Sequence, residues 1–276
     1  AIDEAIVESR LDSSQIDLIS FTKGPGLGPC LRVGAVAART LSLSWRKPLM
    51  AVNHPIAHIE IGRLVGDLSD PVCLYVSGGN TQVLAYSEGR YRVFGETIDI
   101  PVGNCLDVFG RNAGLSDKDF PMGRVIELEA SKGKEYIPIP YVIKGMDVSF
   151  SGILTHVSRL LESKEYSIQD LSFSLQETIF AMLVEVTERA LAHTKKTEVL
   201  VTGGVASNNR LKEMLEKMTL SHNASFEGLK ADLAIDNGVM IAWLGLVMHQ
   251  NGYRTDFEDT IVDQHFRPED VLINWR

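Results

Sequence analysis

The chain has 276 residues, of which 45% are hydrophobic and 23% charged, and a formal net charge of -9 at pH 7. This length allows one large domain or two lobes of ordinary size, and we expect two lobes. The negative charge argues against a protein that holds nucleic acid through its overall field, because phosphate contacts need clustered lysine and arginine. If RNA is a substrate, partners or local basic patches must help to hold it.

Several other classes of protein are disfavoured. The longest apolar run, residues 238–248, is about half of the roughly 20 residues that a membrane-spanning helix needs. The cysteines at 30, 73 and 105 have no CxxC spacing, so neither a disulfide framework nor a thiolate zinc site is indicated. The N-terminal residues are acidic rather than basic, unlike a signal or transit peptide. We therefore expect a soluble protein in a reducing compartment.

The N-terminal part alternates helices with strands. The elements predicted there are a short helix over 1–11, a buried strand over 16–21, a Gly- and Pro-rich turn over 23–29, a helix over 31–45, a strand over 49–53 and a second helix from about His54. This alternation is typical of an α/β fold.

The pattern changes after residue 70, where we place the boundary between an N-terminal lobe, 1–69, and a C-terminal lobe, 70–276, whose last helices can pack back on the first lobe. The elements predicted there are an antiparallel meander of strands over 72–76, 81–86 and 91–96, a helical and irregular section over 102–165, a long helix over 168–194, a strand over 198–202, a helix from about Ser207 and a final helix over 237–250. The final helix is apolar nearly all round, so we expect it to be buried.

His54 and His58 form the first candidate site. Residues four apart share one face of a helix, so two imidazoles can hold a single divalent cation. Pro55 suits the first helical turn and places His54 at the helix entrance. Two polar helix residues satisfied by hydrogen bonds would give the same pattern. A zinc peptidase is disfavoured, because the general-base Glu of that motif should follow the first His.

Two glycine turns form the second and third candidates. In residues 75–81, Tyr-Val-Ser-Gly-Gly-Asn-Thr, the glycines and the hydroxyl suit an anion cradle, although an ordinary hairpin turn is the alternative. In residues 201–209 an apolar strand runs through two glycines to a helix start, which attracts anions. There Ser207 or Asn208 can instead be simply a helix cap.

Two aspartates and one loop complete the candidates. Asp236 precedes the final helix, where a carboxylate can cap the helix or coordinate a metal. Asp107 lies in a largely apolar stretch and can hydrogen-bond a ribose or be a solvated helix position. The loop over 24–28 lacks the Lys-Ser/Thr end of a P-loop, so we interpret it as a tight loop.

Taken together and in this order, these motifs resemble the universal family of tRNA N6-adenosine threonylcarbamoyltransferases, formerly labelled O-sialoglycoprotein endopeptidases. The matching segments are 24–28, 53–60, 75–82, 94–100, 144–152, 176–178 and 203–210. They cover nearly the whole chain from residue 16 onward.

The resemblance implies an α/β fold of the actin/hexokinase/Hsp70 type, with two lobes and a nucleotide between them. It implies one divalent metal, iron or zinc, held by His54, His58 and Asp236 with Tyr75 close to it. The implied contacts to the phosphate and the metal-bound end of the substrate are Tyr75, Val76, Ser77, Gly78 and Gly79, and those to the ribose and base of the adenylate are Asp107, Gly123, Glu127 and Asn208.

The implied reaction transfers threonylcarbamoyl from threonylcarbamoyl-AMP to N6 of the adenosine beside the anticodon of ANN-decoding tRNAs. Residues 95–106 and 144–153 are similar to the archaeal and eukaryotic branch, whose members work in the KEOPS assembly with a small atypical kinase, a small dimerising subunit and further small subunits. That branch is cytoplasmic, and also nuclear in eukaryotes. Two alternatives are a nucleotide- and metal-binding scaffold that regulates a partner kinase and a kinase or ATPase of the same fold class.

Three departures from the family pattern matter. The chain lacks the usual further N-terminal segment, which includes a β-hairpin of the first lobe and a loop near the phosphates. Met122-Gly123 stands where a glycine pair is usual, and residues 229–235 before Asp236 are unusual. These departures bear on independent activity, on the carry-over of Gly123 and Glu127, and on the geometry of the loop before Asp236.

Overall fold

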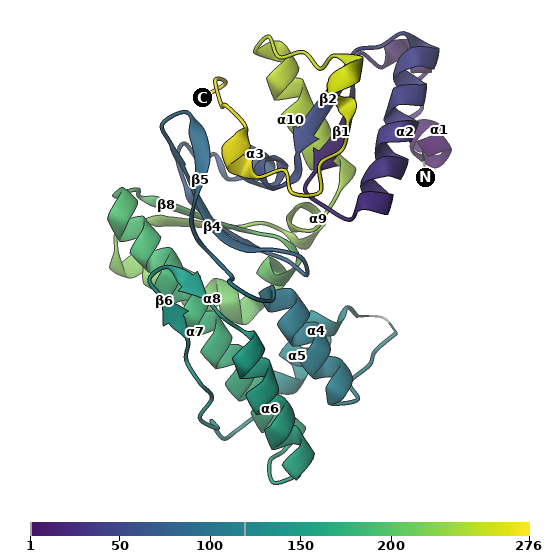
Figure 1. Ribbon diagram of the computed structural model, residues 1–276. Coiled ribbons are helices and arrows are strands. Elements are labelled where there is room, and N and C mark those ends of the chain that lie inside the picture. The colour runs from purple at the N-terminus through teal and green to yellow at the C-terminus, as the bar shows by residue number, and fades with distance from the viewer. Residues whose placement is uncertain (1, 119) are drawn as a thin grey trace. The chain divides into compact units, whose positions relative to one another are not determined.

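The computed structural model describes residues 2–118 and 120–276. The chain forms two compact units (Figure 1). The first unit comprises residues 1–61, 88–91 and 237–276, and the second comprises residues 62–87 and 92–236. A single boundary between lobes at residues 69 and 70 stays a prediction.

The first unit is built on a parallel pair of strands, β1 (Ile19–Gly24) and β2 (Leu49–Asn53), in which Ile19 lies opposite Leu49. A helix, α2 (Gly28–Trp45), joins the strands, as the alternation of elements predicts, and α10 (Gly238–Gln250) contacts both of them. One cluster of buried residues in β1, α2 and β2 contains Ile19, Phe21, Ala35, Ala38 and Leu49. The first unit also contains α1 (Ile2–Ser9), η1 (Ser13–Gln15), the start of α3 (His54–Gly66), η3 (Phe257–Thr260) and η4 (Pro268–Asp270).

Two predictions for this unit are wrong in detail. The first strand begins at Ile19 rather than at residue 16, because a 3-10 turn capped by Asp12 precedes it and the strand continues to Gly24. The final helix is not buried all round, since Val239 is 58% and Leu246 40% exposed. Its covered face is the one that carries Met240, Leu244 and Met248.

Among the described residues, no helix combines the length and the apolar character needed to cross a membrane.

The second unit contains a five-stranded mixed sheet with the strand order β5-β4-β3-β8-β9. Its strands are β3 (Val72–Val76), β4 (Thr81–Ser87), β5 (Arg90–Glu96), β8 (Glu198–Thr202) and β9 (Ser225–Gly228). β3 is antiparallel to β4 and parallel to β8, and β8 is parallel to β9. Every residue of β3 is buried, as expected of a central strand.

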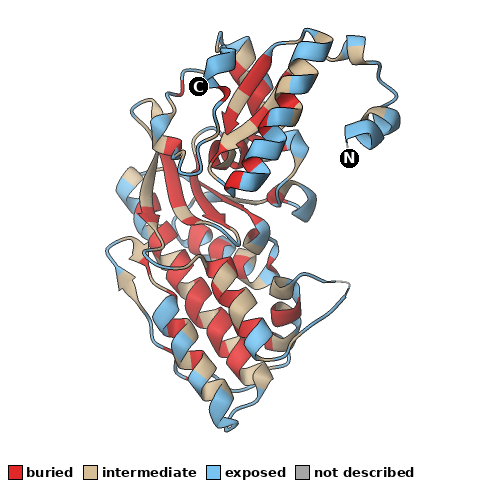
Figure 2. Ribbon diagram, turned by 45° about the vertical axis from the view of Figure 1, so that its right-hand side comes forward, coloured by how far each residue is buried: buried red, intermediate tan, exposed pale blue. Residues whose placement is uncertain are grey.

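The long helix α7 (Ile168–Thr194) packs on β3 and β4 of this sheet. Its predicted apolar stripe of Leu171, Leu175, Ile179, Leu183 and Val186 is buried, which confirms the helical spacing. Figure 2 shows buried positions alternating with exposed ones along the helices of this unit. The remaining elements of the second unit are α4 (Val102–Asn112), α5 (Met122–Ala130), β6 (Ile143–Lys144), β7 (Asp147–Val148), α6 (Ser151–Ser163), η2 (Gly204–Ser207), α8 (Asn209–Ser221) and α9 (Ala231–Ala234).

Asp99 joins the segment before α4 to the start of α6. Its carboxylate accepts hydrogen bonds from the backbone N–H groups of Ile100 (2.7 Å), Phe150 (2.9 Å) and Ser151 (3.1 Å). The hydroxyls of Ser149 and Ser151 donate to it as well, each at 2.6 Å. Partial burial acts to raise the pKa of Asp99, but these hydrogen bonds outweigh it and hold the pKa well below its usual range. The ionised carboxylate therefore stabilises the native state.

Asp99→Asn should lower the free energy of unfolding by about 1 kcal/mol at pH 7, because an amide replaces an acceptor of several charge-assisted bonds. Since the folded pKa is depressed, the contribution of Asp99 is present above the unfolded pKa of about 4 and is lost as pH falls below it. Denaturant unfolding of both proteins from neutral to acid pH should show the two stabilities converging. Asp17→Asn, at an exposed carboxylate before β1, is the control. A difference that stays constant with pH would contradict the account.

Candidate functional site

The turn between β3 and β4 is closed by Ser77. The backbone N–H of Ser77 donates to Asn80 O at 2.8 Å. Its hydroxyl oxygen accepts from the N–H groups of Gly79 (3.3 Å) and Asn80 (3.0 Å). A Cβ on Gly78 or Gly79 would meet no atom within 4 Å. The hydroxyl therefore stabilises the turn, and the open side of the turn is glycine backbone.

The start of α4 lies against this turn. Val102 N donates to Thr81 Oγ1 at 2.8 Å, and Gly103 N donates to Ser77 O at 3.3 Å. A Cβ at residue 103 would lie only 2.6 Å from Ser77 O, a contact that a side chain cannot make. Glycine at this position is thus what lets α4 begin beside the turn.

Asp107 lies four residues beyond Gly103 on α4, on the same face of the helix. Burial raises the pKa of Asp107, while the charge of Arg111 acts in the opposite direction. A half-buried carboxylate beside a cavity is a strong acceptor for hydroxyl groups such as those of a ribose.

A second close approach occurs where β8 ends. Gly203 has a φ of 97°, in the region that favours glycine, and a Cβ there would lie 2.2 Å from Val76 O. Its N–H donates to Ala234 O at 2.9 Å. The chain then forms the 3-10 turn η2, which contacts β3. The start of α8 is placed beside the end of β3 in this way.

Asn208 is the N-cap of α8, which begins at Asn209 rather than at the predicted Ser207. Its side-chain oxygen accepts from Arg210 N (2.9 Å) and Leu211 N (3.2 Å), and its amide donates to Gln176 Oε1 at 3.0 Å. The cap interpretation of Asn208 is confirmed, whereas its contact with a nucleotide stays a prediction.

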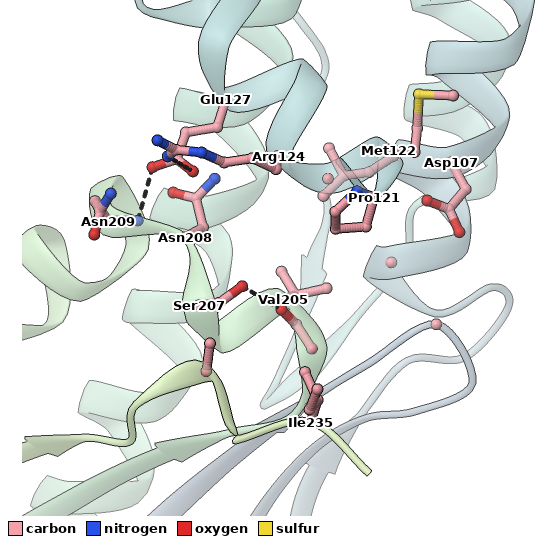
Figure 3. A pocket seen from close by; sticks show the side chains of 16 residues that line it. Asp107, Pro121, Met122, Arg124, Glu127, Val205, Ser207, Asn208, Asn209 and Ile235 are labelled. Carbon is pink, nitrogen blue, oxygen red and sulfur yellow. Dashed lines mark hydrogen bonds and ion pairs between the residues drawn. The ribbon is translucent and has the colours of Figure 1, made fainter. Parts of the chain in front are cut away.

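These segments enclose a cavity of about 560 Å³, a size typical of small-molecule sites (Figure 3). All of its lining residues belong to the second unit. Its apolar lining is Leu106, Pro121, Met122, Val205, Ala231 and Ile235, its polar lining is Asp107, Arg124, Glu127, Ser207, Asn208 and Asn209, and the glycines are Gly78, Gly103, Gly123 and Gly204. The predicted residues Gly78, Asp107, Gly123, Glu127 and Asn208 thus meet around one space. The other predicted substrate contacts are not among its lining residues, namely Tyr75, Val76, Ser77 and Gly79.

Glu127 fixes the side of the cavity formed by α5. One carboxylate oxygen accepts from Asn209 N at 2.9 Å, and the other pairs with Arg124 at 2.6 Å (Figure 3). The carboxylate therefore joins α5 to the start of α8. Sequence reasoning missed Arg124, Met122 and Asn209, although each is next to, or within three residues of, a predicted site residue.

Tyr75 and Asp236 lie near one another in the second unit. Tyr75 is 1% exposed, and its hydroxyl accepts from Asn80 Nδ2 at 3.5 Å. Burial raises the pKa of this hydroxyl, and the negative charge of Asp236 raises it further, against the hydrogen bonds from Ser77 and Asn80.

The two histidines lie where the sequence predicts them, at the first residue of α3 and one turn later. Their ring centroids are 4.8 Å apart at an interplanar angle of 86°, and His58 is fully buried. His54 and His58 belong to the first unit and Asp236 to the second, so a site shared by the three residues stays a prediction. Two imidazoles and a carboxylate suit zinc or iron(II). This donor set fits the implied metal, whereas a role for Tyr75 as a ligand stays a prediction.

Comparison with known proteins identifies the family. The sequence model of the tRNA N6-adenosine threonylcarbamoyltransferases matches residues 1–243. The protein of that name from Thermococcus sibiricus is 51% identical over 274 residues, which cover 99% of this chain and 83% of the relative. A probable tRNA N6-adenosine threonylcarbamoyltransferase from Drosophila melanogaster is also 51% identical, with 100% of this chain and 83% of the relative covered.

Among solved structures, HypF from T. kodakarensis is similar with a TM-score of 0.69 and 15% identity, over 95% of this chain and 44% of that chain. At this identity the likeness concerns the fold alone, and it confirms the predicted α/β fold class. The sequence matches go further than the fold, because they extend over nearly the whole chain at about half identity. The chain belongs to the tRNA N6-adenosine threonylcarbamoyltransferase family.

Proposed function

We propose that this chain is a tRNA-modifying transferase that binds the AMP part of threonylcarbamoyl-AMP in the cavity of the second unit. In the reaction, the N6 amine of adenosine beside the anticodon attacks the carbamoyl carbon, the bond from that carbon to the phosphate oxygen breaks, and AMP and a proton leave. An exocyclic adenine amine is a poor nucleophile, so the chain's contribution is to position an activated donor and to stabilise charge.

The observation that carries the proposal is the pair of close backbone approaches at Gly103 and Gly203. They bring the Ser77–Gly78 turn, the start of α4 and the start of α8 to one cavity. Glycine backbone at the turn suits phosphate oxygens, and Asp107 suits ribose hydroxyls. The apolar residues Leu106, Met122 and Val205 suit a base.

We further propose that His54, His58 and Asp236 hold one divalent metal, iron or zinc, with Tyr75 close to it. Bound there, the metal would supply Lewis-acid polarisation and orientation of the donor. The burial of His58 and its helical spacing from His54 support this proposal, because they place the two imidazoles side by side on one helix.

Partners of the KEOPS type, including a small atypical kinase and a small dimerising subunit, belong to the same proposal, as does a cytoplasmic location, with a nuclear one as well in a eukaryote. The net charge of -9 supports a need for partners in holding tRNA. The alternative, a scaffold that regulates a partner kinase, is the weaker account, because the relatives matched over the whole chain are named as transferases.

Gly103→Ala should weaken AMP binding about tenfold, because a methyl group 2.6 Å from Ser77 O forces α4 away from the turn at a cost of about 1–3 kcal/mol. Calorimetric titration with AMP measures the affinity. Gly152→Ala in α6 is the matched control, since its Cβ would meet no atom within 4 Å. Equal affinities for the two variants would contradict the proposed cavity.

Asp107→Ala should also weaken AMP binding, by about tenfold, through loss of a charged acceptor. The wild type should discriminate against 2′,3′-dideoxy-AMP, and the variant should not. Burial raises the pKa of Asp107, so its carboxylate becomes protonated at a higher pH than an ordinary aspartate does. As the pH is lowered, the affinity of the wild type for AMP should therefore begin to fall at a higher pH than an aspartate of ordinary pKa would give. Discrimination that survives in the variant would place the ribose elsewhere.

His54→Ala should lower the affinity for Zn²⁺ more than about 100-fold, beyond the usual cost of losing an outer-shell residue. It should also abolish threonylcarbamoyladenosine formation in ANN-decoding tRNA, measured by mass spectrometry of nucleosides with the intact partners and a donor-making enzyme. His156→Ala in α6 is the control. An unchanged nucleoside yield in the His54 variant would rule out the metal role.

A further inference from the structure

Asn53, the last residue of β2, has both ends of its side-chain amide engaged. Its Oδ1 accepts from Ile56 N at 3.2 Å, and its Nδ2 donates to Phe266 O at 2.9 Å. The side chain is 2% exposed. Since one partner is an N–H and the other a carbonyl, only this orientation of the amide satisfies both. Asn53 therefore caps α3 and at the same time holds a segment 213 residues away in the chain.

The position of Asn53 matters because no loop separates β2 from α3. The strand ends at Asn53, and the helix begins at His54. His58 follows one turn later, so both imidazoles move with the first turn of this helix. A capping bond to Ile56 N alone fixes the helix end locally, whereas the second bond fixes it to another part of the first unit.

The segment that receives this bond is itself held tightly by the loop after β1. Asp263 N donates to Lys23 O at 2.9 Å, and Gly26 N donates to Gln264 O at 3.4 Å. A Cβ at Gly24 would lie 1.7 Å from Asp263 O, so the two backbones are in direct contact. Residues 263–267 are thus fixed between the β1 loop and Asn53.

The same stretch reaches α3 at a second point through the residues that follow. Ile273 N donates to Gly89 O at 2.7 Å, and Arg90 donates to Glu269 O at 2.7 Å. Next to Arg90, the buried Tyr91 hydroxyl donates to Glu60, which lies on α3. Residues 263–276 therefore contact the helix of the histidines near its start and, through the 88–91 turn, six residues further on.

We propose that residues 263–276 form a brace for α3 and that Asn53 is the positioning residue through which this brace sets His54 and His58 for metal binding. The proposal rests on the proposed metal site. Because the coupling is an equilibrium property, it works in both directions: the brace favours metal binding, and a bound metal stabilises the brace.

The test separates the cap of Asn53 from its link to the brace. Asn53→Ser keeps a capping oxygen but is too short to reach Phe266 O, and Asn53→Ala removes both bonds. Asn251→Ser is the matched control, because Asn251 also donates its amide to a backbone carbonyl, Val247 O at 2.9 Å, in the same unit. The probe is Zn²⁺ titrated into the full chain in a chelator buffer, with hydrogen exchange of the 263–267 amides measured in parallel.

We expect Asn53→Ser to lower the Zn²⁺ affinity about tenfold, which is at the lower end of the effect of residues that orient metal ligands without binding the metal. Asn251→Ser should leave the affinity unchanged. In the wild type, Zn²⁺ should slow exchange at residues 263–267, and in Asn53→Ser this protection should be lost. Gly24→Ala, whose added methyl group displaces Asp263, should also lower the Zn²⁺ affinity and the protection of residues 263–267.

Either of two results overturns the brace: equal Zn²⁺ affinities for Asn53→Ser and Asn251→Ser, or no change of exchange at 263–267 when the wild type binds Zn²⁺. The second result needs no variant, so it decides even where a substitution prevents folding. Failure of the metal site itself is a different observation, namely Zn²⁺ binding by the wild type that His58→Ala does not weaken, and it removes the brace proposal with the site.

Discussion

Close packing of backbone against backbone at the end of β3 is the constraint on which the second unit depends. The carbonyl of Val76 faces Gly203, and the carbonyl of Ser77 faces Gly103, at distances that no Cβ tolerates. Side-chain packing elsewhere in the unit can adjust by rotamer changes, but a backbone contact of this kind cannot. These two contacts therefore decide where α4 and α8 begin, and the cavity is the space that their first turns leave open.

A similarly close connection occurs in the first unit, where α3 follows β2 directly without a loop. There the amide of Asn53 fixes the start of the helix, because it donates to Phe266 O and accepts from Ile56 N. Both devices place chemistry at the carboxyl end of a parallel strand, the usual location of ligands in α/β proteins. The residues that act on substrate or metal are few, and the groups that hold them are mostly backbone.

Most of the elements are predictable from the sequence because their signals are local. The apolar stripe of α7 and the runs of β2, β3 and β8 predict their bounds closely. The prediction that the final helix is buried is wrong because an apolar composition does not reveal which face is covered, and Val239 is exposed. The predicted start of the first strand is too early because the 3-10 turn over residues 13–15 depends on the capping side chain of Asp12 rather than on periodicity.

The candidate site was predictable only in part. Spacing on a helix predicts the pairing of His54 with His58, and the family resemblance implies that Asp107, Glu127 and Asn208 belong together. Nothing local indicates that Glu127 would bind the backbone of Asn209 or that the amide of Asn208, besides the capping bonds of its oxygen, would donate to Gln176. Such contacts join residues far apart in the chain, so they follow from the fold and not from any pattern in the sequence.

The most direct test of the central claim is a crystallographic difference map of the chain with AMP and Zn²⁺, recorded with anomalous scattering at the zinc edge. The account predicts nucleotide density in the cavity beside Gly78, Gly103 and Asp107, together with an anomalous peak within coordination distance of His54 and His58. Nucleotide density outside this cavity, or an anomalous peak away from both histidines, would contradict it.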